Sequence, residues 1–186
     1  MPSKPVTIVL LGADRVGKST IISNTLQKYL DHDRDAVALH FSGPQPHHSN
    51  PIEQYTVPFD SVLETMPEFI LCDRGFSEVC FYDKFRRHVN ISHEWAQAAE
   101  SYFVDKSQAV HVFFVKRSWE WCLLHHKMEV QDLYPGCSAW FKRNQLEMRK
   151  AEHYAYYEYM ENYLDNHSLL PYTVIERAPL NHAISV

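Results

Sequence analysis

The sequence has little of several features that define other classes of protein. Its 186 residues carry a formal net charge of −5, so the basic face that duplex nucleic acid requires is not evident. The apolar run near the N-terminus is too short for a secretion signal or a membrane-spanning helix. Its four cysteines, at positions 72, 80, 122 and 137, include no pair with CxxC spacing. These absences favour a cytoplasmic protein with reduced thiols, and they argue against a membrane or nucleic acid as a partner.

Glycine is also scarce, and two of the five glycines lie in one short stretch. Residues 12–19 read Gly-Ala-Asp-Arg-Val-Gly-Lys-Ser, which matches the phosphate-binding P-loop pattern G-x-x-x-x-G-K-S/T. Residues 6–11 are apolar and typical of a buried strand, and residues 19–30 have helical spacing. Such a loop points successive backbone N–H groups at one phosphate, beside the positive end of a helix dipole. The stretch therefore predicts binding of a nucleotide phosphate.

The side chains of this loop indicate how it would act on ATP. Lys18 is a point charge that can reach the β- and γ-phosphates, and the Ser19 hydroxyl is a ligand for Mg²⁺. Arg15 can spread its guanidinium over the γ-phosphate, where charge develops during transfer. Asp14 cannot bind phosphate favourably and should face a sugar hydroxyl or the incoming substrate, unless it forms an ion pair with Arg15. The residues predicted to bind the ATP phosphates are Gly12, Gly17, Lys18, Ser19 and Thr20.

The rest of the chain alternates strand and helix patterns, which predicts a doubly wound α/β domain with five parallel strands flanked by helices. Strands are expected at 6–11, 36–41, 68–72, 109–115 and 172–176, and helices at 19–30, 60–65, 77 onward, 92–103, 118–126 and 139–166. Prolines in residues 42–58 argue against regular structure over most of that segment. We predict an acceptor-binding loop at about residues 42–66 and a lid at about residues 127–138, within one kinase domain of residues 1–186.

Parallel strands bring the residues after their carboxyl ends to one rim of the sheet. Phe41, Asp73, Arg74 and Arg117 follow strands and should meet the P-loop there. Asp73 can hold Mg²⁺ or accept the proton of an attacking hydroxyl, and Arg74 presents a fork suited to phosphate. The alternative is that Asp73 caps the next helix and Arg74 is a surface charge.

Two of these segments resemble the thymidylate kinase family. Residues 11–20 resemble its P-loop, in which an Asp-Arg pair precedes the last glycine. Residues 73–77, Asp-Arg-Gly-Phe-Ser, resemble its Asp-Arg-Tyr-x-x-Ser segment, although they are one residue shorter and have Gly for Tyr. The family's Phe-Pro-x-Arg stretch is Phe-Ser-Gly-Pro here, at residues 41–44, and lacks the arginine.

The resemblance implies a role for several residues. Arg15 would assist phosphoryl transfer, because the expected lid carries no arginine. Asp14 would contact the 3′-hydroxyl of a deoxynucleotide, Asp73 would lie near Mg²⁺, and Arg74 would hold the phosphate of the acceptor. Phe41 is expected to bind the acceptor together with Asp14 and Arg74. Family members are often dimers, which implies that a homodimer is the assembly to test.

We therefore expect a Mg-ATP-dependent kinase for a deoxynucleoside 5′-monophosphate, with Lys18, Arg15 and Asp73 as catalytic residues and Ser19 and Asp73 as metal ligands. One alternative is a kinase for a nucleoside or for a hydroxymethylated base in DNA, in which Asp73 would be the base for a hydroxyl. Another alternative is a nucleotide-binding switch with no acceptor and no catalysis.

Overall fold

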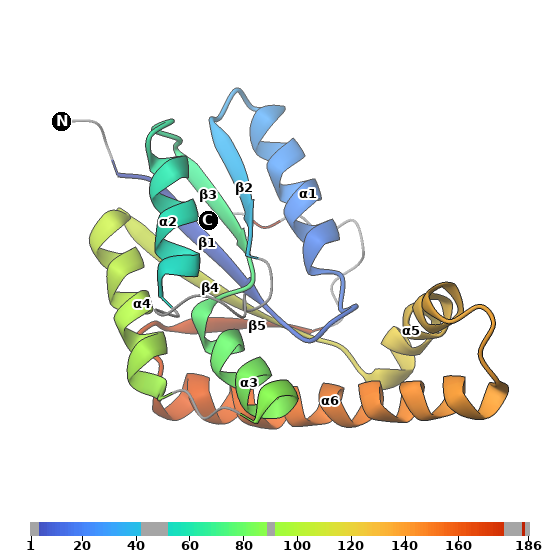
Figure 1. The fold of residues 1–186 in the computed structure, drawn as a ribbon. Helices are drawn as coiled ribbons and strands as arrows, with labels where there is room; N and C mark the ends of the chain where they lie inside the picture. Colours follow the sequence, from blue (N-terminus) through green and yellow to red (C-terminus); the bar gives the residue numbers. More distant parts are fainter. Residues whose placement is uncertain (1–3, 42–51, 89–91, 177–183, 185–186) are drawn as a thin grey trace.

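The computed structural model describes residues 4–41, 52–88, 92–176 and 184. Five parallel strands form one sheet in the order β2-β3-β1-β4-β5, which confirms the predicted fold class (Figure 1). The strands are β1 (Val6–Leu11), β2 (Ala36–His40), β3 (Phe69–Asp73), β4 (Ala109–Lys116) and β5 (Tyr172–Glu176). The helices are α1 (Lys18–Leu30), α2 (Glu53–Leu63), α3 (Phe76–Arg87), α4 (His93–Lys106), α5 (Trp119–Leu133) and α6 (Ala139–Asn166).

The order of the strands places the helices on the two faces of the sheet. The crossover through α1 runs toward one edge, whereas the later crossovers run toward the other edge. Because such crossovers are right-handed, α1 covers one face, and α2, α3, α4 and α6 lie on the opposite side, as Figure 1 shows. The central strands β1 and β3 are almost completely buried. These two buried strands therefore fix the positions of the loops that follow their carboxyl ends.

Helix α2 begins earlier than the sequence pattern predicts. It covers residues 53–63 and contains Pro58, although prolines in residues 42–58 argued against regular structure. Tyr55 and Phe59, both on α2, are buried, and their rings lie 4.7 Å from that of Phe41 and 4.3 Å from that of Phe103, respectively. Burial of these rings stabilises the helix by more than the missing N–H of one proline costs. Residues 42–51 of the expected acceptor-binding loop lie outside the described residues.

Helix α5 extends further than predicted, to Leu133 instead of about residue 126. Only residues 134–138 connect it to α6, so most of the expected lid is helical. Val130 is buried near the end of α5, and this anchor favours continuation of the helix. Figure 1 shows α5 lying against the first half of α6, where the two helices extend beyond the sheet.

The four cysteines differ in burial. Cys72, Cys80 and Cys122 are free and buried, whereas Cys137 is free and exposed. Burial raises the pKa of the Cys80 and Cys122 thiols to about 11. Within the described ranges, no helix has both the length and the apolar composition needed to cross a membrane.

Candidate functional site

The P-loop joins β1 to α1 and needs glycine at two positions. Gly17 has a φ of 92°, a left-handed conformation that favours glycine. A Cβ on Gly12 would lie 2.8 Å from the Val115 carbonyl oxygen and 2.8 Å from the side chain of Val16. Lys18 is buried and its Nζ donates to the carbonyl oxygens of Gly12, at 2.5 Å, and Ala13, at 3.0 Å. The lysine thus folds back over the loop that it follows.

Ser19 and Asp73 meet at the rim, as the sequence predicts. The Ser19 Oγ donates to the Asp73 Oδ2 at 2.7 Å, and the His40 Nδ1 lies 3.2 Å from the same oxygen. Asp73 is buried, and its Oδ1 has no hydrogen-bond partner among the residues that the structure describes. Gly75 is the N-cap residue of α3 and its N–H donates to the Glu78 carboxylate, so Asp73 does not cap this helix. A serine hydroxyl beside an incompletely bonded carboxylate suits a hard cation such as Mg²⁺.

Asp14 forms ion pairs with Arg74, in the turn before α3, and with Arg86, in the last turn of α3. The Arg74 NH2 lies 3.1 Å from the Asp14 Oδ1, and the Arg86 NH2 lies 3.3 Å from the Oδ2. The Tyr82 hydroxyl donates to the Oδ1 at 3.4 Å, and both guanidinium groups lie over the Tyr82 ring. Burial alone would raise the pKa of Asp14, but the charges of Lys18, Arg74 and Arg86 hold it below its ordinary value. Asp14 is therefore an ionised carboxylate next to the predicted phosphate site of the acceptor.

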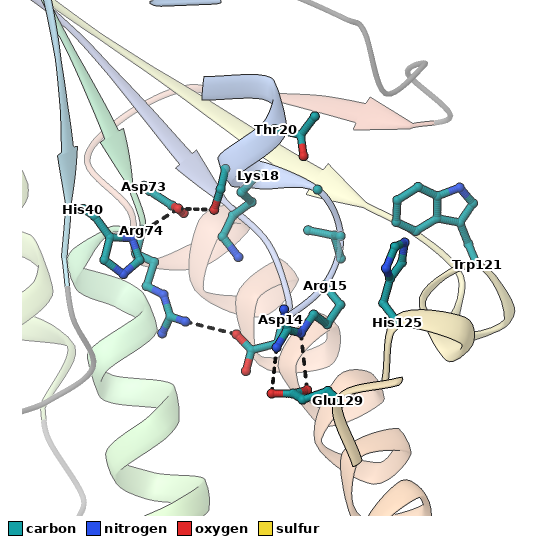
Figure 2. Close-up of a pocket in the computed structure, with 13 residues that line it drawn as sticks. Asp14, Arg15, Lys18, Thr20, His40, Asp73, Arg74, Trp121, His125 and Glu129 are labelled. Atoms are coloured by element: carbon teal, nitrogen blue, oxygen red, sulfur yellow. Dashed lines mark hydrogen bonds and ion pairs between the residues drawn. The ribbon is translucent and has the colours of Figure 1, made fainter. Parts of the chain in front are cut away.

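Arg15 pairs with Glu129 of α5, not with Asp14. Its NH2 lies 2.7 Å from the Glu129 Oε1, and its Nε donates to the Oε2 at 3.3 Å. The same Oε2 accepts a hydrogen bond from the Arg149 NH1 of α6 at 2.8 Å. The close-up in Figure 2 shows Arg15 and Glu129 joined in this way beside the phosphate loop. The contact links the α5–α6 pair to the P-loop.

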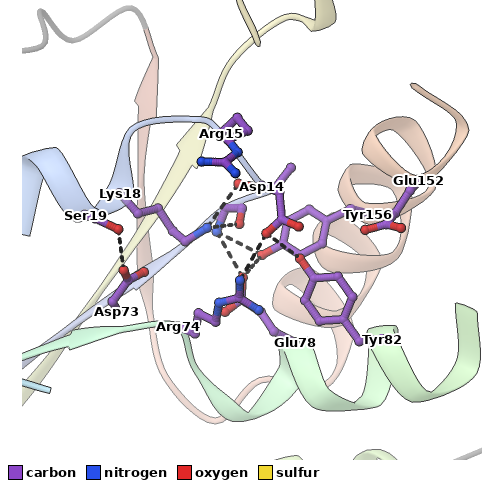
Figure 3. A network of polar contacts seen from close by, with 12 residues as sticks. Asp14, Arg15, Lys18, Ser19, Asp73, Arg74, Glu78, Tyr82, Glu152 and Tyr156 are labelled. Carbon is purple, nitrogen blue, oxygen red and sulfur yellow. Dashed lines mark hydrogen bonds and ion pairs between the residues drawn. The ribbon is translucent and has the colours of Figure 1, made fainter. Parts of the chain in front are cut away.

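A buried carboxylate connects the P-loop to the turn that carries Arg74. Glu78 accepts hydrogen bonds from the backbone N–H of Gly12 at 3.4 Å, from that of Gly75 at 3.0 Å, and from the Tyr156 hydroxyl (Figure 3). Burial raises the pKa of Glu78, although the charges of Lys18 and Arg74 oppose this rise. Glu78 therefore holds the loops of two neighbouring strands at a fixed separation.

These loops enclose a cavity of about 510 Å³. Figure 2 shows His40 and Arg74 on one side of the phosphate loop and Trp121 and His125 on the other. The lining residues are Asp14, Arg15, Val16, Gly17, Lys18, Ser19, Thr20, His40, Asp73, Arg74, Trp121, His125 and Glu129. The cavity therefore brings together eight predicted site residues: Asp14, Arg15, Gly17, Lys18, Ser19, Thr20, Asp73 and Arg74.

Two predicted site residues do not line this cavity. Gly12 lies behind it, where its N–H donates to the Tyr156 hydroxyl at 2.9 Å. Phe41 is 2% exposed and packs on Tyr55, with Phe76 and Phe103 further away in the same cluster. Phe41 is thus a core residue in this structure, and its contact with an acceptor remains a prediction.

Sequence reasoning missed His40, Trp121, His125 and Glu129 as cavity residues. The signal for three of them was their spacing of four residues on α5, which puts positions 121, 125 and 129 on one face of a helix. That face could not be recognised while the helix was expected to end near residue 126. In the described part of the chain, no three His, Cys, Asp or Glu side chains gather to hold a metal. A Mg²⁺ ion at Ser19 and Asp73 would then take its remaining ligands from phosphate and water.

The comparisons with known proteins concern the fold. No family model and no curated protein matches the sequence. Polyphosphate kinase 2 from Arthrobacter aurescens TC1 is similar in structure, with a TM-score of 0.52 and 15% identity over 94% of this chain and 62% of that one. This chain therefore spans less than two thirds of the length of that protein.

Two further solved structures match more weakly. A deoxyadenosine kinase from M. mycoides, with dCMP and a flexible dCDP bound, has a TM-score of 0.47 and 15% identity over 94% of this chain and 92% of that one. The PezAT toxin–antitoxin system of Streptococcus pneumoniae has a TM-score of 0.42 and 16% identity over 82% of this chain and 65% of that one. Together with the sheet order and the loop after β1, the match to polyphosphate kinase 2 shows that the chain has an α/β P-loop fold.

Proposed function

We propose that this protein is a Mg-ATP-dependent kinase that phosphorylates a deoxynucleoside 5′-monophosphate. The observation that carries the proposal is that Lys18 and Arg74 line the same cavity from neighbouring loops, with Ser19 and Asp73 beside them. A nucleotide-binding switch has no need for a second phosphate-binding side chain. Two cationic side chains on one cavity suit two phosphorylated substrates that meet end to end.

Each residue has a role in this proposal. The loop amides and Lys18 bind the β- and γ-phosphates, and Arg15 stabilises the charge that develops on the transferred group. Arg74 orients the acceptor phosphate, and the Asp14 carboxylate accepts a hydrogen bond from a sugar hydroxyl. Catalysis then consists of positioning and charge stabilisation, because phosphoryl transfer requires little other chemistry from the protein.

The Ser19 hydroxyl and the Asp73 carboxylate fit a Mg²⁺ ion. Both are oxygen ligands, and the Oδ1 of Asp73 has no hydrogen-bond partner within the described ranges. Held by these two side chains, Mg²⁺ would supply positive charge that offsets part of the negative charge of the phosphates. Ser19 would then give up its hydrogen bond to Asp73, and Asp73 would hold the ion directly or through water.

The second candidate is a kinase whose acceptor is a hydroxyl group, on a nucleoside or on a hydroxymethylated base in DNA. Asp73 favours it, since this buried carboxylate lies at the cavity and could accept the proton of the hydroxyl. The pairing of Arg74 and Arg86 around Asp14 favours a phosphorylated acceptor instead, because guanidinium groups that bind one anion can bind another.

Incubation of the protein with labelled ATP and a panel of acceptors tests the proposal. The panel contains nucleosides, deoxynucleoside and ribonucleoside monophosphates, and DNA with hydroxymethylated bases. Labelled deoxynucleoside diphosphate is the expected product, and Lys18→Ala should reduce it by a factor of about a thousand. Lys106→Ala is the matched control, since this exposed lysine ends α4 at the opposite end of the sheet.

Other outcomes would contradict the proposal. A labelled nucleoside monophosphate or labelled DNA would support the second candidate, and release of phosphate alone would indicate a switch. Inorganic polyphosphate serves as a second donor in parallel reactions, because polyphosphate kinase 2 has a similar fold. Full activity of Lys18→Ala would exclude the P-loop as the site of transfer.

A further inference from the structure

A carboxylate at the edge of a phosphate-binding cavity is unexpected, because it repels a triphosphate. Glu129 lines the cavity with the P-loop residues, although it comes from α5. Burial alone would raise its pKa, but the hydrogen bond from Arg15 and the charge of Arg149 hold the pKa below the ordinary value. Glu129 is thus ionised, and its presence at this position calls for a physical reason.

The contacts of Glu129 supply that reason. Its two oxygens take the Nε and NH2 edge of the Arg15 guanidinium at 3.3 and 2.7 Å. The Arg149 NH1 donates to the Oε2, the oxygen that also accepts from the Arg15 Nε, at 2.8 Å. His126, one turn earlier on α5, lies 3.8 Å from Glu129 and is neutral at pH 7, because burial and Arg149 lower its pKa to about 4. The cluster of Arg15, Glu129 and Arg149 therefore keeps one net positive charge.

We propose that Glu129 is a positioning residue that orients the Arg15 guanidinium toward the γ-phosphate of the donor. This inference rests on the proposed function and deepens it. A guanidinium has five N–H donors on a rigid fork, so a carboxylate on its Nε edge leaves the opposite edge to bind an oxyanion. Arg149 on α6 holds Glu129, and the α5–α6 pair thereby sets the position of a P-loop side chain.

The exposure of the Arg15 side chain explains why such a support is needed. Arg15 has a φ of 66°, in the left-handed region, and its side chain is 47% exposed. An exposed arginine samples many rotamers and loses entropy when it binds phosphate. A carboxylate that fixes the guanidinium beforehand reduces this loss, which is the usual gain from preorganisation.

Removal of the charge of Glu129 should change the affinity for the triphosphate in opposite directions under two simple models. If Glu129 only repels the triphosphate, Glu129→Gln should tighten its binding. If Glu129 positions Arg15, the same change should weaken binding of the triphosphate and leave the diphosphate alone, because Arg15 would contact only the γ-phosphate. Binding of ADP and of the non-hydrolysable ATP analogue AMP-PNP, each with Mg²⁺, separates these models without catalysis.

The titrations use the full chain as wild type, Arg15→Ala, Glu129→Gln and the double variant. We expect Glu129→Gln to weaken AMP-PNP binding about fivefold and to change ADP binding less than about twofold. The double variant should bind AMP-PNP no more weakly than Arg15→Ala, because the carboxylate acts through that arginine. Glu147→Gln on α6 is the control for the same chemical change at an exposed position, and it should bind both nucleotides as the wild type does.

Several results would overturn the inference. Tighter AMP-PNP binding by Glu129→Gln, equal changes for the two nucleotides, or a further loss in the double variant would each do so. Thermal unfolding of every variant separates loss of folding from loss of positioning. A wild type that prefers AMP-PNP through Glu129 but phosphorylates no acceptor would contradict the proposed kinase activity and leave this inference standing.

Discussion

Ser19 donates a hydrogen bond to the buried carboxylate of Asp73 at 2.7 Å, across 54 positions of sequence. The pairing of β1 with β3 brings Ser19 and Asp73 together, because the P-loop follows β1 and Asp73 ends β3. The two ligands proposed for Mg²⁺ thus face each other before any ion binds. This hydrogen bond connects the P-loop to the turn that carries Arg74.

Asp73→Asn should reduce kinase activity about a hundredfold and raise the Mg²⁺ concentration needed for half-maximal rate. The amide keeps the volume of the side chain but loses the negative charge that attracts the ion. Initial rates measured over a range of Mg²⁺ concentrations check this. Ser19→Ala, which removes the other proposed ligand, should raise this Mg²⁺ concentration as well, and Ser23→Ala, at an exposed position on α1, is its control. An unchanged Mg²⁺ dependence in Asp73→Asn would rule out a metal at this position.

Arg74→Lys should raise the KM for the acceptor about thirtyfold, with a much smaller effect on the KM for ATP. Lysine keeps the charge, but it cannot offer the two parallel N–H groups that a phosphate accepts. Arg34→Lys is the control, because Arg34 is an exposed arginine paired with Glu68 before β2, away from the cavity. Steady-state kinetics with each substrate varied in turn separates the effects. Equal changes in both KM values would count against an acceptor role for Arg74.

Gly12→Ala should lower the free energy of unfolding by about 1–3 kcal/mol and impair nucleotide binding. The added methyl group would lie 2.8 Å from the Val115 carbonyl oxygen, which is backbone and cannot rotate away. Gly136→Ala is the matched control, since a Cβ there meets no atom within 4 Å. Denaturant unfolding of both variants measures the difference. Equal stability of the two variants would show that the P-loop backbone adapts to a side chain.

Acid should destabilise the protein in part through His126. This residue is 3% exposed and its pKa falls to about 4, because burial and Arg149 disfavour the charged form. The unfolded chain binds a proton near pH 6.5, whereas the folded chain does not, so the free energy of unfolding decreases as the pH falls from about 6.5 to 4.

His126→Gln should reduce this fall, and His125→Gln, at the exposed neighbouring position, should leave it intact. Denaturant unfolding at several pH values between 4 and 7 provides the comparison. A pH dependence that is unchanged in His126→Gln would mean that other groups, such as the buried His153, dominate acid unfolding.

Much of the site followed from local pattern. The spacing of two glycines and a lysine predicted the P-loop, and the apolar run before Asp73 predicted a strand that ends at the same rim. These features are local because a phosphate loop needs particular backbone angles, and a buried strand needs consecutive apolar residues. The alternation of strand and helix patterns along the chain predicted the fold class without knowledge of any distant contact, and the order of the strands in the sheet confirmed it.

Other features could not be predicted because they depend on packing between distant segments. The burial of Phe41 and the start of α2 before Pro58 result from one aromatic cluster that joins α2, α3 and α4. The pairing of Arg86 with Asp14 spans 72 positions, and no local spacing records it.

The sequence by itself determined the phosphate loop, the strands and the charged residues at the ends of the strands. Each of these features depends on the backbone conformation and burial of residues that are adjacent in the sequence. Only the tertiary structure decided which partner each charge would take. Arg15 pairs with Glu129, 114 positions away, and not with the adjacent Asp14, because α5 continues past residue 126 and brings that carboxylate to the loop. The partner of a charged side chain depends on which helix packs beside it. The packing of the whole core determines which helix that is.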